Sequence, residues 1–289
     1  MFCIIPINGD GFRSQVLSFQ RPPSSLRILC LGDSQTFGNG VAQDETYPAK
    51  LESQLSSRKD ARPVEVINAG IQGYEIQQEV KLLERITLTR PDLVTIGFYL
   101  NDISEILTSK HREIIDGEFK DGGSVKQFVP YRLIYALKRS RLVTLLYWRY
   151  RIFQSDAEGN PLKEILLGKT PAKFAKSWQL IEEALLQAKK LALAHHFRLI
   201  VFPVPTGEEF LMDYPNEDYR SRLLALADRL EIESFDPTPE MKSAGGGFDR
   251  YFITWDGHIN SVTHALIAQL LADRIAPRDK QVTNLLRIK

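Results

Sequence analysis

The sequence has little cysteine, with only Cys3 and Cys30 in a chain of 289 residues. Two thiols are too few for a disulfide framework or for a cysteine-rich metal site. Because Cys30 lies in an apolar strand pattern, we interpret it as a small buried side chain. An excess of charge is also missing, since the formal net charge is +1. The overall charge therefore does not indicate a nucleic acid or an acidic surface as a partner.

Long hydrophobic runs are absent as well, and no stretch of the sequence is long enough to span a membrane. The apolar opening MFCIIPI (1–7) is short and has neither a basic lead-in nor a cleavage site, so we do not predict a signal peptide. The sequence as written predicts a cytoplasmic protein. A longer native N-terminus would change this expectation to a periplasmic or anchored protein.

A regular alternation of strand and helix patterns is present. Short apolar runs predict strands at 27–31, 64–68, 92–98, 198–204 and 231–235. Helical spacing of apolar residues predicts helices at 46–55, 75–86, 175–195, 219–230 and 261–275. Strands separated by helices form a parallel sheet with helices on both faces. We therefore predict an α/β fold with a three-layer, doubly wound (flavodoxin-like) sheet of about five parallel strands.

The domain organisation follows from the same pattern. We expect a lead-in at 1–25, one domain over 26–275 and a C-terminal tail at 276–289. Between about 103 and 174 the alternation stops, and this interval contains a helical, aromatic and basic stretch at 131–151. We interpret the interval as an insertion over the active edge of the sheet, with its apolar side packed and its basic side in water. Contact of this insert with an anionic substrate or a membrane surface is the alternative.

Four short polar stretches lie where a doubly wound sheet binds its ligands, at the carboxyl ends of strands. They are GDS with Ser34, NAGIQGYE with Gly73, GFYLND with Asn101, and WDGHIN with Asp256 and His258. Each stretch taken alone has a plain structural explanation, namely an N-cap, a turn, a strand-end asparagine or a pair that closes a loop. Their order is more informative, because all four project to the same edge of the sheet.

The residue types suit one chemistry. A serine hydroxyl at this edge can act as a nucleophile, and an Asp-x-His pair in a loop can place a carboxylate against Nδ1 of the imidazole while Nε2 acts as the base. Backbone N–H groups at a helix start or glycine turn, and the amide of an asparagine, can donate to a developing oxyanion. The four stretches together therefore favour acyl transfer.

The four stretches resemble the four sequence blocks of the SGNH family, also called GDSL-type serine hydrolases. The resemblance covers roughly residues 26–102 and 175–275 and leaves the insert outside. It implies a nucleophile, a base, the partner of the base and an oxyanion hole, which would be Ser34, His258, Asp256, and the group of Ser34, Gly73 and Asn101.

Two departures from the family pattern concern the first and last blocks. The first block reads GDSQ instead of GDSL, and one residue separates Asp256 from His258, where many members have two.

The stretch GDGFR (9–13) also resembles a segment ahead of this core in bacterial relatives, many of them exported or anchored. That likeness weakens the cytoplasmic expectation.

We expect a serine hydrolase that needs no cofactor or metal and acts on a small-molecule or carbohydrate ester, with an O-acetylated carbohydrate as the first choice of substrate. A lipid or thioester acyl group, acetyl transfer to a sugar, and a catalytically idle binding protein remain alternatives. A nucleotide site is disfavoured, because LLGKT (166–170) has Lys163 where a phosphate loop needs its first glycine. A metal hydrolase is disfavoured because the other histidines show no ligand spacing; these are His111, His195, His196 and His264.

Overall fold

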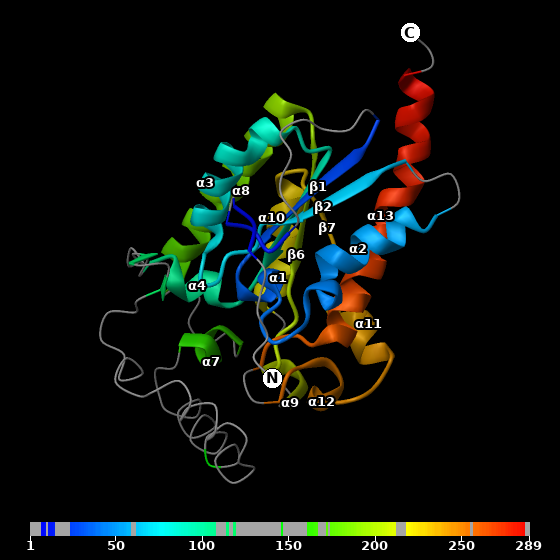
Figure 1. Ribbon diagram of the computed structural model, residues 1–289. Helices are drawn as coiled ribbons and strands as arrows, with labels where there is room; N and C mark the ends of the chain where they lie inside the picture. The colour runs from blue at the N-terminus through cyan, green and yellow to red at the C-terminus, as the bar shows by residue number, and fades with distance from the viewer. Residues whose placement is uncertain are drawn as a thin grey trace.

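The computed structural model describes residues 7–9, 11–14, 24–58, 62–107, 114–115, 118–119, 146, 161–166, 172, 174–211, 218–254 and 257–286. Its centre is an all-parallel sheet with the strand order β2-β1-β3-β6-β7 (Figure 1). The strands are β1 (Leu26–Gly32), β2 (Val64–Asn68), β3 (Leu93–Phe98), β6 (Arg198–Pro203) and β7 (Glu233–Ser234). This order is the flavodoxin-like one, which confirms the predicted fold class.

The burial of each strand follows from its place in the sheet. All residues of the central strands β1 and β3 are buried, as expected for strands that are covered on both faces. The strand β7 at one edge is shorter than the predicted 231–235. The N–H of Ile232 donates to the carbonyl of Ala227 at the end of the preceding helix, so this residue cannot join the ladder. A local bond at the end of α10 therefore makes β7 begin only at Glu233.

Helices cover both faces of the sheet, which makes three layers (Figure 1). Leu29 and Leu31 of β1 belong to one apolar core, and the alternate residues Ile28 and Cys30 belong to the other. The first core is closed by α3 (Ile76–Ile86), α8 (Ala175–His195) and α10 (Asp218–Arg229). The second core is closed by α2 (Tyr47–Ser56), α11 (Thr238–Ser243) and α13 (Ser261–Leu286), the last of which continues past the predicted end at 275.

Short elements lie beyond the carboxyl ends of the strands or in the connections. Figure 1 shows several of them gathered below the sheet. The short helices are α1 (Ser34–Phe37), α4 (Asn101–Glu105), α7 (Pro161–Leu166), α9 (Glu208–Leu211) and α12 (Phe248–Tyr251), with 3-10 turns at Gln43–Glu45 and Thr87–Thr89. A small antiparallel hairpin joins β4 (Ile114–Ile115) to β5 (Glu118–Phe119).

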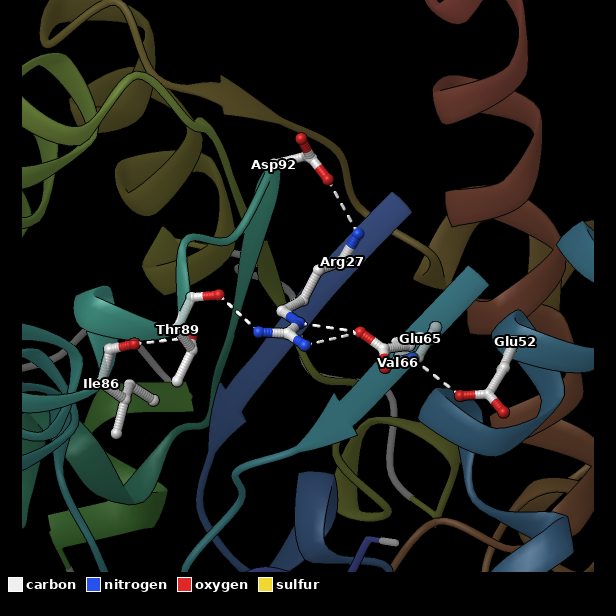
Figure 2. A network of polar contacts seen from close by, with 7 residues as sticks. All are labelled: Arg27, Glu52, Glu65, Val66, Ile86, Thr89 and Asp92. Carbon is white, nitrogen blue, oxygen red and sulfur yellow. Dashed lines mark hydrogen bonds and ion pairs between the residues drawn. The ribbon is translucent and has the colours of Figure 1, made fainter. Parts of the chain in front are cut away.

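A buried arginine organises the amino-terminal end of the sheet (Figure 2). The guanidinium of Arg27 lies 2.8 Å from the carboxylate of Glu65 on β2 and donates to the carbonyl of Thr89 at 2.6 Å. The backbone N–H of Arg27 donates to the carboxylate of Asp92 at 2.8 Å. These bonds join β1 to β2 and to the turn that leads into β3.

The predicted helical stretch at 131–151 lies outside the described residues except for Leu146, so its packing stays a prediction. None of the helices in the described part of the chain combines the length and apolar character that a membrane crossing requires.

Candidate active site

Ser34 is the first residue of α1 and follows directly on the turn after β1; we call residues 32–35 the serine turn. This turn needs glycine at position 32, where φ is +152° and a Cβ would lie 2.0 Å from Oγ1 of Thr36. The N-cap of α1 is Asp33, whose carboxylate accepts a hydrogen bond from the N–H of Gln35 at 2.8 Å. The N-cap interpretation of Ser34 is therefore wrong, since its neighbour performs that task and leaves the hydroxyl of Ser34 for another partner.

That partner is His258, which is 224 positions away in the chain. Oγ of Ser34 and Nε2 of His258 are 2.9 Å apart. In the tautomer with its proton on Nδ1, the imidazole accepts the hydroxyl proton of Ser34 at Nε2. The histidine loop is fixed by the N–H of Ile253, which donates to the carbonyl of His258 at 2.8 Å. Asp256 lies outside the described residues, so its role as partner of the imidazole stays a prediction.

The loop after β2 packs directly on α1. The N–H of Ile71 donates to the carbonyl of Gly32 at 2.9 Å, and a Cβ at Gly70 would lie 2.4 Å from the backbone nitrogen of Phe37. Gly73 has φ of +72°, in the left-handed region that favours glycine. The two glycines thus permit the close approach and the turn that bring this loop beside the serine turn.

Asn101 begins α4 just after β3. Its Oδ1 is buried and accepts no hydrogen bond from the residues that the structure describes. The strand-end interpretation, in which this oxygen bonds to its own backbone, is therefore wrong. Burial raises the pKa of the neighbouring Asp33 carboxyl group, and the side chain of Asn101 opposes this by favouring the charged form. Since an ionised carboxylate only accepts hydrogen bonds, the Nδ2 amide is the group of Asn101 that can stabilise it.

The residue after Asn101 ties two of the loops together. The carboxylate of Asp102 accepts hydrogen bonds from the N–H of Tyr99 and from the N–H of Ile76, each at 2.9 Å. Tyr99 precedes Asn101, and Ile76 is the first residue of α3, three positions after Gly73. Asp102 therefore sets the position of the glycine loop relative to Asn101.

Buried carboxyl groups accumulate behind this edge of the sheet. We call Asp33, Glu75, Glu79 and Asp102 the acidic cluster; each is 2% exposed or less. Burial raises the pKa of Asp33 to about 6, although the N–H of Gln35 and the nearby His258 act in the opposite direction. Burial and then the neighbouring acidic groups raise the pKa of Glu79 and Asp102 well above their ordinary values. Burial therefore favours the protonated form of these carboxyl groups more than water does.

Comparison with known proteins agrees with this arrangement. Residues 30–266 match the model of the GDSL-like lipase/acylhydrolase family. The chain belongs to this family. It is accordingly an ester-hydrolysing enzyme, because ester hydrolysis is the activity of this family. None of the curated proteins matches the sequence.

Solved structures of GDSL and esterase proteins share the fold at low sequence identity. The acetyl xylan esterase AlAXEase is 17% identical with a TM-score of 0.50, over 86% of this chain and 100% of that chain. TesA is 14% identical with a TM-score of 0.50, over 87% and 98%. A lipolytic protein of the G-D-S-L family from Veillonella parvula is 15% identical with a TM-score of 0.48, over 88% and 99%.

Two further residues considered in the sequence have structural roles in this GDSL enzyme. Burial raises the pKa of the Cys30 thiol to about 12, which makes it a poor nucleophile and confirms its interpretation as a buried side chain. His264 is fully buried, and its Nδ1 accepts a hydrogen bond from the N–H of Tyr47 at 3.1 Å. Burial lowers the pKa of His264 to about 3, so it packs as a neutral ring. Within the described residues, no group of three His, Cys, Asp or Glu side chains could hold a metal ion.

The sequence analysis missed four polar residues that support the site, which are Asp33, Gln35, Glu79 and Asp102. Three of them are next to predicted site residues within the family blocks, and this adjacency was the available signal. Glu79 carried a weaker signal. It lies three residues after Ile76 and four before Leu83, which places it on the buried face of α3.

Proposed function

We propose that this esterase cleaves its substrate through an acyl-enzyme on Ser34, with His258 as the general base. The observation that carries the proposal is the 2.9 Å distance between Oγ of Ser34 and Nε2 of His258. Such a distance is within the range in which a base takes a proton from a nucleophile. Asp256 is assigned, from the family resemblance, to hold the imidazole in the required tautomer.

The reaction proceeds in two halves. Oγ of Ser34 forms a bond to the ester carbonyl carbon while its proton passes to Nε2 of His258, and the carbonyl oxygen becomes an oxyanion. The intermediate then breaks its carbon–oxygen bond to the alcohol, which leaves with the proton from His258. Water attacks the acyl-enzyme in the same way, gives a proton to His258, and releases the carboxylic acid as Ser34 regains its proton.

The oxyanion is assigned to three donors, the N–H of Ser34, the N–H of Gly73 and Nδ2 of Asn101. Support comes from the packing of their loops, since the N–H of Ile71 in the glycine loop donates to the carbonyl of Gly32, and Asn101 lies near Asp33. Each such donor typically contributes about 2.7–4 kcal/mol to stabilisation of the transition state.

An O-acetyl group on a carbohydrate is the substrate that we propose. In the loops that carry the described site residues, the half-buried side chains are largely polar or aromatic, among them Asn39, Gln72, Tyr74 and Tyr99. Hydroxyl-rich ligands suit such a surface, whereas a long acyl chain requires an apolar pocket. The acetyl xylan esterase of similar fold adds weaker support, because the likeness at this identity concerns the fold.

The nucleophile is tested with a fluorophosphonate probe and Ser34→Ala. We expect the probe to label Ser34, and Ser34→Ala to lose turnover of p-nitrophenyl acetate while its circular dichroism is unchanged. A Ser34→Ala protein with full activity, or labelling at another serine, would overturn the assignment. Asp256→Ala in the same assay tests the predicted partner of His258, with a large loss of kcat expected.

The acyl group and the acceptor are tested separately with the wild-type protein. Acetylated oligosaccharides and p-nitrophenyl acetate should be cleaved faster than p-nitrophenyl palmitate or an acyl thioester. Faster cleavage of the long-chain esters would point to a lipid substrate instead. Product analysis with a free sugar present separates hydrolysis from acetyl transfer, since only transfer yields a newly acetylated sugar.

A further inference from the structure

Gln35 occupies the position at which the family name has leucine. It is the second residue of α1 and is 3% exposed, so its polar side chain needs partners inside the protein. Its Oε1 accepts a hydrogen bond from the N–H of Ile259 at 3.0 Å. Its side chain also lies near Tyr99, where it opposes the effect of burial, which raises the pKa of that hydroxyl. A residue on the serine turn thus contacts both the histidine loop and the loop of Asn101.

The partner of Gln35 is a backbone group that the histidine loop cannot satisfy itself. Phe252 and Ile259 face each other in an antiparallel bridge. The hydrogen bonds of this bridge come from the flanking residues, Ile253 with His258 at 2.8 Å and Asn260 with Tyr251 at 2.9 Å. The N–H of Ile259 therefore points away from the bridge. The residue is also buried, since its side chain is 1% exposed.

The geometry points to Gln35 as a positioning residue that holds His258 in register with Ser34. Two contacts run in parallel between the serine turn and the histidine loop. One joins Ser34 to His258 at 2.9 Å, and the other joins the next residue on each segment, Gln35 to Ile259, at 3.0 Å. The second contact does not depend on the protonation state of the imidazole, so it persists while His258 takes and returns its proton.

This role explains why the departure from GDSL is compatible with an intact site. A leucine at position 35 would fill similar space but offer no acceptor, and the buried N–H of Ile259 would lack a partner. The histidine loop would then shift to find another partner or water. A displacement of about 1 Å in a catalytic group can reduce the rate by about 100-fold.

The test restores the family residue with Gln35→Leu and measures p-nitrophenyl acetate turnover together with the rate of fluorophosphonate labelling of Ser34. We expect kcat to fall at least tenfold, KM to stay within about twofold, and labelling to slow in proportion to kcat. Gln35→Glu retains an acceptor for the N–H of Ile259 and should recover a large part of kcat. Gln35→Asn keeps the amide but withdraws it by one methylene, so it should behave like Gln35→Leu.

The matched control removes a side-chain acceptor from a backbone N–H that lies away from the active site. Glu52 on α2 accepts from the N–H of Val66 at 2.7 Å on the edge strand β2 (Figure 2), so Glu52→Leu makes a comparable loss away from Ser34. It should lower the urea midpoint and leave kcat unchanged. A Gln35→Leu protein with kcat within threefold of wild type would overturn the proposal, and so would a Gln35→Asn protein with wild-type kcat if Gln35→Leu fails to fold.

This inference rests on the proposed nucleophile, and the two can fail separately. If wild-type protein is not labelled at Ser34, the nucleophile assignment fails before the variants are compared. If wild-type protein is labelled and the Gln35 variants are labelled equally fast, only the positioning role fails.

Discussion

The two ends of the central sheet differ in the surroundings of their buried ionisable groups. At the amino-terminal end, the guanidinium of Arg27 is 1% exposed and is matched by the carboxylate of Glu65 and the carbonyl of Thr89 (Figure 2). At the carboxyl end, the acidic cluster brings like groups together; burial raises the pKa of Glu79 and Asp102, and the neighbouring carboxyl groups raise it further. The buried charge at the amino-terminal end has partners of opposite charge, whereas the carboxyl groups at the other end lie close to groups of the same charge.

From this difference we infer that the amino-terminal end contributes mainly to stability and the carboxyl end mainly to activity. A buried ion pair with complete hydrogen bonding holds strands in place and is costly to break. Crowded carboxyl groups destabilise the folded protein, yet Asp33 and Asp102 use their oxygens to fix the turns that carry the predicted site residues. Active sites commonly retain such features at the expense of stability. Substitutions at the two ends should therefore separate stability from activity.

The largest expected effect at the carboxyl end is on catalysis. Asn101→Ala removes one proposed oxyanion donor, so kcat for p-nitrophenyl acetate should fall about 100–1000-fold. The free energy of unfolding should change by about 1 kcal/mol or less, because Oδ1 of Asn101 accepts no hydrogen bond within the described part of the chain and only its polar contact with Asp33 is lost. Urea denaturation and steady-state kinetics on the same preparation check both. A kcat within threefold of wild type would remove Asn101 from the oxyanion hole.

The opposite outcome is expected at the amino-terminal end. Arg27→Met leaves Glu65 without its buried partner and should cost about 3 kcal/mol of unfolding free energy, at the low end of the range because Glu65 is 33% exposed. The kcat of the folded fraction should not change.

The matched control for Arg27→Met is an exposed pair of the same residue types. Arg229 lies 2.9 Å from Glu182, and the two side chains are 62% and 38% exposed. Arg229→Met should cost about 1 kcal/mol or less. Equal losses of stability in the two variants would mean that burial does not distinguish the two ion pairs.

Much of the fold could be predicted because local patterns set its elements. The strand at 64–68 and the helix at 175–195 have the predicted bounds, since each has a distinct apolar pattern. The start of β7 was not predicted, because the N–H of Ile232 bonds to the carbonyl of Ala227 at the end of α10 and the strand begins only at Glu233. The apolar pattern shows which residues are buried, but it does not show where the backbone N–H groups at a helix end find their partners.

The candidate site divides in the same way. The order of the polar stretches predicted that Ser34 and His258 would meet, because parallel strands direct their carboxyl ends to one edge. The bond from Ile259 to Gln35 could not be predicted, since it involves a backbone N–H whose direction is set by the bridge to Phe252. A glutamine in a turn gives no sign in sequence of such a partner.

The smallest effect is expected for Glu79→Gln, which tests the acidic cluster through the pH dependence of stability. Both carboxyl oxygens of Glu79 are buried and make no hydrogen bond to any residue that the structure describes, and burial raises its pKa well above the ordinary value of 4.5. Between these two pKa values the folded protein binds a proton that the unfolded chain has released, so this group contributes less stability as pH rises. Glutamine is neutral in both states and removes that dependence. The stability of Glu79→Gln relative to wild type should therefore increase from pH 4 to pH 8.

Urea denaturation at one-unit pH steps measures this difference, and Glu84→Gln at an exposed position of the same helix serves as control. The control removes a carboxyl group that stays in contact with water, so the difference between the two variants isolates the effect of burial. A difference for Glu79→Gln that stays flat would mean that Glu79 is ionised in the folded protein. The acidic cluster would then hold its charge as the amino-terminal end does, and the contrast between the two ends of the sheet would disappear.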